Sequence, residues 1–306
     1  MTVVSPTIKR SISTDITLMA KKIIFKKLNL IAAAFFTLTL STAYQPITPP
    51  KQEGKSSLNQ VRTIVLDAGH GGKDPGARGS KTTEKVIALQ VALKLGEKIK
   101  KDLPGVKVIY TRSSDVFIDL YKRPDIANKA KADLFISIHC NSANGSKRVR
   151  GRNGKYYSQT VRRPTVRGTE TFVLGFNRMG KQDVAIRENA AILFEENYEE
   201  NYGGFDPKDP SSMIVFQLLK TQYRRESIRL GSYMQDEYVR TQRNNRGVQE
   251  LSLAVLKTAG MPAVLTEIGF ISSPQEETYM MSNAGQTEIV TSLFNAIKTY
   301  KTSVER

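Results

Sequence analysis

Three short apolar runs along the chain each end beside a residue that can bind a metal or move a proton. The runs cover residues 63–66, 134–138 and 263–266, and they lead to His70, His139 and Glu267, respectively. Apolar, β-branched runs of this length are typical of buried parallel strands. In an open α/β sheet, functional sites lie beyond the carboxyl ends of the strands. We therefore expect both imidazoles and one carboxylate to converge on one rim of a sheet.

Helical patterns alternate with these runs. The segment from about Thr83 to Lys101 has an apolar face at helical spacing, which predicts a helix directly after the first strand. We predict further strands at residues 106–110, 169–176 and 251–256, and further helices at 120–131, 183–202, 212–242 and 286–300. This alternation predicts the α/β fold class: a single domain over residues 61–301, with a mostly parallel sheet covered by helices on both faces.

The N-terminus has the layout of a secretory signal peptide over residues 1–43. Four lysines precede the apolar stretch 28–40, and Ser41-Thr42-Ala43 follows with small residues at the cleavage positions. The apolar stretch is short for a membrane span, which favours a cleaved signal peptide. An uncleaved anchor helix is the alternative. Met19 lies just before the lysines, so translation could start there. Residues 44–60 form a polar linker, and we expect the protein to be exported to the periplasm or cell envelope.

The chain is strongly basic, with a formal net charge of +17. Without residues 1–43 it retains 40 Lys and Arg against 28 Asp and Glu. Such a balance favours a polyanionic partner. Export argues against nucleic acid and favours an anionic envelope polymer. The segment 144–168 holds eight basic residues and no acid. It is either a solvated surface loop or a surface that binds the anionic polymer electrostatically.

The two histidines of the chain, His70 and His139, indicate a zinc site. Catalytic zinc takes three nitrogen or oxygen ligands and keeps one open position. Glu84 is the best third ligand, because it begins the helix that follows the glycine-rich loop 69–79. Asp67 is less well placed within its strand, and Asp74 could turn outward with Pro75. The alternatives are ordinary polar histidines and a phosphate-binding glycine loop, but the loop lacks the Lys-Ser/Thr of a P-loop.

Glu267 is the candidate general base, because it ends the third run but is not needed as a ligand. It would take a proton from the attacking water and deliver it to a leaving amine. A capping or salt-bridged carboxylate is the alternative for this residue. Cys140, the only cysteine, excludes an intrachain disulfide and a cysteine-rich zinc site. We interpret it as a small packed residue, since strand neighbours point to opposite faces.

Four sequence blocks resemble the zinc-dependent N-acetylmuramoyl-L-alanine amidases, cell-wall hydrolases of the kind that separate daughter cells. The blocks are Leu66–Ala77, Thr83-Glu84-Lys85, Ser137–Ala143 and Leu265–Ser272. The resemblance covers about residues 61–300 and implies a central sheet of six strands. It also implies one zinc ion held by His70, Glu84 and His139, with Glu267 as the catalytic carboxylate. The implied reaction cuts peptidoglycan between N-acetylmuramic acid and L-alanine.

The acidic segment 183–222 resembles an insertion that covers the zinc cleft of some division amidases until an activator protein displaces it. Glu188 is then the first candidate for the open position of the metal, followed by Glu195 and Glu196. An ordinary surface helix is the alternative. For the whole protein, two other functions stay open: a zinc peptidase that cuts within the stem peptide, and an inactive wall-binding module.

Overall fold

A computed structural model describes residues 60–175, 182–195 and 210–306. The predicted signal peptide, the predicted linker up to residue 59, and Glu196 lie outside these residues. Within the described ranges, the helices are all too short or too polar to cross a bilayer. The described residues all belong to one compact unit.

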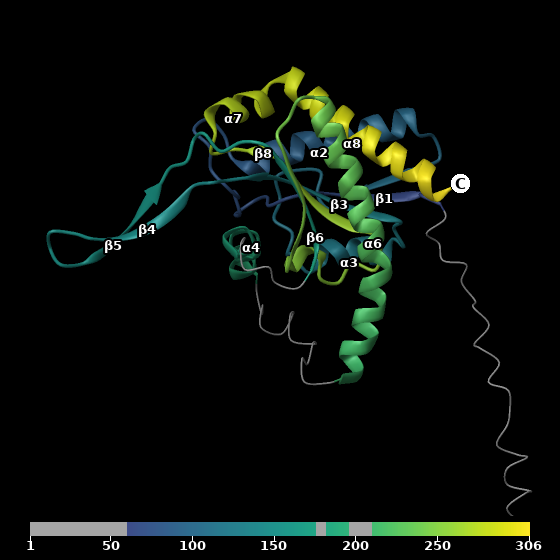
Figure 1. The fold of residues 1–306 in the computed structure, drawn as a ribbon, viewed down its shortest axis with the longest axis horizontal. Helices are drawn as coiled ribbons and strands as arrows, with labels where there is room; N and C mark the ends of the chain where they lie inside the picture. Colours follow the sequence, from purple (N-terminus) through teal and green to yellow (C-terminus); the bar gives the residue numbers. More distant parts are fainter. Residues whose placement is uncertain (1–59, 176–181, 196–209) are drawn as a thin grey trace, which may run out of the picture. The chain divides into compact units, whose positions relative to one another are not determined.

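A six-stranded sheet forms the centre of this unit, in the order β2-β1-β3-β8-β6-β7 (Figure 1). The strands are β1 (Thr63–Ala68), β2 (Lys107–Tyr110), β3 (Leu134–Asn141), β6 (Thr169–Leu174), β7 (Asn245–Leu251) and β8 (Ala263–Phe270). Neighbouring strands are parallel except for β6 and β8, which pair antiparallel. The central strands β3 and β8 are buried along their whole length, which is why they lack alternation. The predicted fold class is confirmed.

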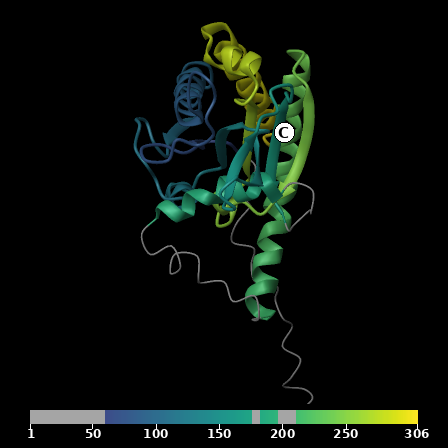
Figure 2. The ribbon, with the colours of Figure 1, turned by 90° about the vertical axis from the view of Figure 1, so that its left-hand side faces the viewer.

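Helices cover both faces of the sheet (Figures 1 and 2). They are α2 (Glu84–Asp102), α3 (Lys122–Lys129), α4 (Gln182–Asn189), α6 (Pro210–Arg240), α7 (Pro274–Met281) and α8 (Asn283–Val304), with 3₁₀ turns η2 (Ala190–Phe194) and η3 (Ala254–Leu256). Helices α2, α6 and α8 pack on one face around Leu66 and Ile136. Segments α3, α4 and η3 pack on the other face around Val65 and Phe135. Side chains of adjacent strand positions thus feed two separate cores.

Three sequence-based element predictions were wrong, and one helix was missed. The helix predicted at 183–202 stops early, because α4 ends at Asn189 and the turn η2 follows it to Phe194. The strand predicted at 251–256 is instead β7, which ends at Leu251, followed by the turn η3. The segment 144–168, predicted as a loop, contains an antiparallel hairpin of β4 (Gly145–Arg150) and β5 (Tyr156–Val161). Helix α7 was not predicted. Strand β7 lies at the sheet edge and β4–β5 is exposed, so burial imposes no apolar pattern on them.

Candidate metal centre

Four buried side chains meet at the carboxyl ends of the central strands. His70, Glu84, His139 and Glu188 each offer one ligand atom, and these atoms all lie within 4.8 Å of one another. They come from the loop after β1, the start of α2, the end of β3, and α4. The two imidazole rings meet edge to face, with centroids 4.8 Å apart. The structure thus brings together all three predicted ligands and the first candidate for the open position.

Hydrogen bonds orient the ring of His70. Its Nδ1 lies 2.7 Å from Asp74 Oδ2, which turns Nε2 toward Glu84 Oε2 at 3.1 Å and Glu188 Oε2 at 3.5 Å. Asp74 is buried and also accepts a hydrogen bond from the Gly76 N–H. The expectation that Asp74 turns outward was therefore wrong. A carboxylate behind a histidine fixes the ring tautomer and frees the other nitrogen for a metal.

Backbone N–H groups hold Glu84 in place. Its Oε2 accepts from Ala77 and its Oε1 from Cys140, each at 2.8 Å. Gly76 is required beside it, because a Cβ there would clash with the His70 ring and with Glu84. Burial would raise the pKa of Glu84, but the charge of His70 and the hydrogen bond from His139 lower it to about 2. Glu84 is thus held as a carboxylate.

His139 faces the same point from β3. Its Nδ1 lies 2.9 Å from Glu188 Oε2 and 3.0 Å from Glu84 Oε1. Burial favours the neutral ring, yet the carboxylates of Glu188 and Glu84 raise the pKa of His139 to about 9. A Cβ at position 69 would clash with this ring, which explains the glycine there. The adjacent Cys140 is buried in the core, as predicted for a packed residue, and burial raises the pKa of its thiol.

This donor set fits a divalent cation. Within the described residues, His70 Nε2 and Glu188 Oε2 have no hydrogen-bond partner although both are buried. Buried polar atoms without partners are costly, and a metal ion would satisfy them. Two imidazole nitrogens with carboxylate oxygens suit zinc well. A cation would also replace the protons that otherwise balance two carboxylates in the buried cluster.

Glu267 lies beside the cluster but is not one of its four residues. It is fully buried and pairs in register with His139 across β3 and β8. Neither of its oxygens has a hydrogen-bond partner in the described part of the chain, and Arg187 Nη2 is 3.6 Å away. Burial, followed by the charge of Glu188, raises the pKa of Glu267 well above the ordinary value. A carboxyl group with a raised pKa can carry a proton near neutral pH.

Arg187 was missed in the sequence. Its guanidinium donates to Ser142 O at 2.9 Å and to Asn141 Oδ1 at 3.0 Å, and it lies 2.9 Å from Glu188 Oε1. It therefore ties α4 to the segment after His139. The one signal in the sequence that pointed to Arg187 was its position next to Glu188. That signal is weak, because neighbouring residues of opposite charge are common on any helix.

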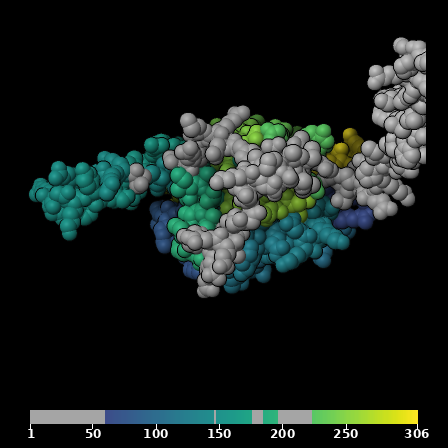
Figure 3. Space-filling model, turned by 90° about the horizontal axis from the view of Figure 1, so that it is seen from below, coloured from purple at the N-terminus to yellow at the C-terminus, as the bar shows by residue number. Residues whose placement is uncertain are grey.

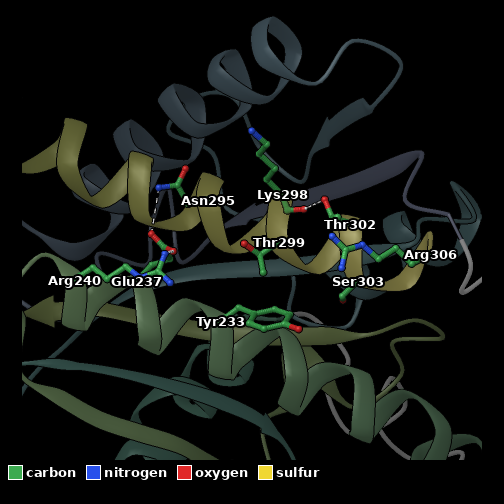
Figure 4. A pocket seen from close by; sticks show the side chains of 9 residues that line it. All are labelled: Tyr233, Glu237, Arg240, Asn295, Lys298, Thr299, Thr302, Ser303 and Arg306. Atoms are coloured by element: carbon green, nitrogen blue, oxygen red, sulfur yellow. Dashed lines mark hydrogen bonds and ion pairs between the residues drawn. The ribbon is translucent and has the colours of Figure 1, made fainter.

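Of the other two candidate glutamates, Glu195 is not among the residues of the cluster. Glu195 accepts a hydrogen bond from the Leu120 N–H at 2.6 Å, so it anchors the end of η2 to the chain before α3. Glu196 lies outside the described residues. A cavity of about 440 Å³ lies between α6 and α8 and is lined by polar side chains (Figure 4). It contains none of the predicted site residues.

Comparison with known proteins agrees with this geometry. A family model described as N-acetylmuramoyl-L-alanine amidase matches residues 64–299, and the chain belongs to this family. The amidase AmiC of Escherichia coli O6:H1 is 30% identical over 262 residues, which cover 83% of this chain and 56% of AmiC. AmiA of Escherichia coli K12 is 29% identical over 244 residues, covering 78% of this chain and 76% of AmiA. The chain thus spans little more than half of AmiC.

Solved structures share the fold. The N-acetylmuramoyl-L-alanine amidase from Clostridium difficile 630 superimposes with a TM-score of 0.54 at 25% identity, over 80% of this chain and 98% of that structure. The family resemblance inferred from the four sequence blocks is confirmed.

Proposed function

We propose that the chain is a zinc-dependent N-acetylmuramoyl-L-alanine amidase acting on peptidoglycan, in wall remodelling or daughter-cell separation. It would cut the amide between the lactyl group of N-acetylmuramic acid and L-alanine of the stem peptide. The main support is the buried convergence of His70, Glu84 and His139 beside Glu267, in a chain of the amidase family. AmiC and AmiA are named for this activity.

The site residues would have two roles: three of them would bind the metal ion, and one would transfer protons. His70, Glu84 and His139 would hold the ion, with Asp74 and the backbone N–H groups of Ala77 and Cys140 fixing their orientation. A bound zinc supplies Lewis-acid activation of the carbonyl and of water. Glu267 would accept a proton from the attacking water and donate it to the leaving L-alanine nitrogen. The surrounding burial keeps bulk water from competing for that proton.

Mass spectrometry of digested muropeptides tests the bond that is cut. Free stem peptides with intact glycan strands are expected, whereas shortened stems still attached to glycan would show a zinc peptidase.

Metal analysis of the purified protein should give one zinc per chain, and the ion should be lost in a His139→Ala variant. If a Glu267→Ala variant lysed walls as fast as wild type, the lysis would not depend on the proposed catalytic carboxylate, and the proposed site would be wrong.

We further propose that α4 restrains the enzyme as part of a regulatory insertion over residues 183–222. Glu188 lies within the cluster, 2.9 Å from His139 Nδ1, where the carbonyl of a substrate would have to approach. Arg187 fastens the same helix to Ser142 and Asn141. An activator protein would then have to displace α4. Deleting residues 183–222 should speed hydrolysis of purified sacculi, and an unchanged rate with an intact fold would contradict this proposal.

The proposed substrate places the mature enzyme in the periplasm or cell envelope. The signal-peptide layout of residues 1–43 supports export, with a linker to residue 60 and the catalytic domain over residues 61–301. Peptidoglycan rather than nucleic acid would be the polymer bound by the basic surface. N-terminal sequencing of the mature protein tests this assignment, which predicts cleavage after Ala43.

A further inference from the structure

The hairpin β4–β5 carries a dense positive charge. Residues 145–167 include eight Lys and Arg and no acid: Lys147, Arg148, Arg150, Arg152, Lys155, Arg162, Arg163 and Arg167. All eight are exposed. The ion pairs found among the described residues include none of them. This charge is therefore available to a partner.

Tyrosines lie among these cations. Arg150 pairs with Tyr156 across the hairpin, so both side chains share one face, and the Arg148 guanidinium lies 5.0 Å from the Tyr156 ring centroid. Tyr157 lies on the opposite face and pairs with Val149. Tyr156 and Tyr157 are 58% and 48% exposed. Both faces thus offer hydrogen-bond donors, positive charge and a flat aromatic surface.

The stability of the folded domain does not explain why the hairpin carries these charged and aromatic side chains. Among the described strands, β4 and β5 pair only with each other, and a two-stranded hairpin alone gains little stability. Figure 1 shows the hairpin standing away from the central sheet, and in Figure 3 the same segment projects as a teal extension. Its exposed residues pack on no core, so their chemistry points to binding rather than folding.

The hairpin begins at the rim that carries the metal centre. Gly145 follows His139 by only six residues. At its base, the Ala143 N–H donates to Ser272 Oγ and the Arg163 N–H donates to Asn144 Oδ1. The first bond ties the start of the hairpin to the segment just after β8, and the second ties the two ends of the hairpin to each other. Each strand of six residues then reaches about 20 Å outward. The hairpin thus starts at the metal-bearing rim and extends outward from it.

We propose that β4–β5 is a binding arm for peptidoglycan strands beyond the bond that is cut, which rests on the proposed function. Its cations match the free carboxylates of neighbouring stem peptides, and its tyrosines match the apolar faces of sugar rings. Two weak contacts on one polymer strengthen each other through the effective concentration they create. A lipid surface fits less well, because neither face of the hairpin is apolar enough to enter a membrane.

Sedimentation with purified sacculi tests the arm. All proteins tested are the full chain carrying Glu267→Gln, so that the wall is not digested. The arm variant carries four further changes: Arg148→Gln, Arg150→Gln, Arg152→Gln and Lys155→Gln. The matched control removes the same charge from the body through Arg62→Gln, Lys101→Gln, Lys107→Gln and Lys131→Gln, all at exposed positions. The arm variant should bind sacculi roughly tenfold more weakly, as expected for several exposed charges, and the control should bind nearly normally.

Two further measurements separate the arm from the catalytic proposal. In the Glu267 background, binding should weaken with salt and should not transfer to anionic phospholipid vesicles or duplex DNA. In the otherwise wild-type enzyme, the arm variant should lose hydrolysis of sacculi but keep its rate on a soluble disaccharide-peptide. Equal sacculus binding by arm variant and control, or preferential binding to vesicles or DNA, would overturn the arm. If the wild-type enzyme hydrolysed neither sacculi nor the soluble disaccharide-peptide, while sacculus binding still depended on the arm, the amidase proposal would be contradicted and the arm would stand.

Discussion

Glu267 is the residue at which the proton-transfer proposal can be tested without disturbing the ligands. A Glu267→Gln variant keeps the shape of the side chain but cannot exchange a proton. We expect kcat to fall by about 10²–10⁴-fold, the usual contribution of a general base, with zinc content unchanged. Hydrolysis of a soluble muropeptide and metal analysis of the same sample measure both quantities. A variant that kept the wild-type kcat would exclude Glu267 from proton transfer.

Asp74 acts on the metal only through His70, so its removal should change affinity more than chemistry. An Asp74→Asn variant keeps the volume but weakens the 2.7 Å contact to Nδ1. We expect zinc to bind about 10–100-fold more weakly, with kcat largely restored at saturating zinc. Competition with a chromophoric chelator measures the affinity. A purely structural role would instead lower kcat at every zinc concentration.

The two histidine ligands could be predicted from sequence because each follows an apolar strand and the carboxyl ends of parallel strands share a rim. Glu84 could be predicted because it begins the helix that the glycine-rich loop leads into. Asp74 and Arg187 could not. The direction of Asp74 depends on the left-handed backbone of His70, with φ of 61°, and of Gly72 and Gly76, which the pattern of residue types does not reveal. Arg187 owes its position to the packing of α4 against the segment after β3, a contact between parts distant in sequence.

Helix α4 is the element whose displacement should switch the activity. A Glu188→Ala variant removes the carboxylate that faces both histidines while leaving the metal ligands in place. If the enzyme is mostly restrained, we expect kcat/KM on sacculi to rise by about tenfold, because a larger fraction becomes competent. A Glu97→Ala variant, which changes an exposed acid on α2, is the control. Unchanged activity in the Glu188 variant would mean that α4 does not restrain the enzyme.

At the scale of elements, burial decided which predictions succeeded. Strands β3 and β8 are fully buried, so their apolar runs stood out in the sequence. Strand β7 has one buried residue, Leu251, and its polar composition suggested the wrong boundary. The hairpin β4–β5 pairs through its backbone while both faces meet solvent, so nothing in its hydropathy distinguishes it from a loop.

For the whole molecule, metal binding should contribute to stability because the metal ligands come from three separate parts of the chain: the loop after β1, the start of α2 and the end of β3. A ligand that binds only the folded state at 1,000 times its Kd adds about 4 kcal/mol to the free energy of unfolding. For a domain of this size, that corresponds to roughly 10 °C in Tm. Chelation should lower Tm by that amount, and re-added zinc should restore it. A His139→Ala variant serves as the reference and should show no chelator response.

Acid stability depends on a second buried charge, Asp67, which fixes the loop that carries His70. Asp67 accepts from Arg123 at 2.9 Å and from Thr111 and Ser137 at 2.6 Å each, and Arg123 also donates to the carbonyls of Ala68 and His70. Burial opposes the charge, but Arg123 and the two hydroxyls lower the pKa of Asp67 below the usual 3.8. A lowered folded pKa means that the stabilisation is complete above about pH 3.8 and is lost as the pH falls through the folded value.

An Asp67→Asn variant should therefore be destabilised at pH 7 by about 3–5 kcal/mol, because it leaves the Arg123 guanidinium buried without a counter-charge. The difference from wild type should shrink below pH 3.8, since wild-type Asp67 then takes up a proton and loses the same charge. Urea unfolding at a series of pH values measures this difference, with Asp236→Asn, an exposed acid, as the control. A deficit independent of pH would trace the instability to packing rather than to the charge. In that case His70 would be positioned by the shape of the loop alone.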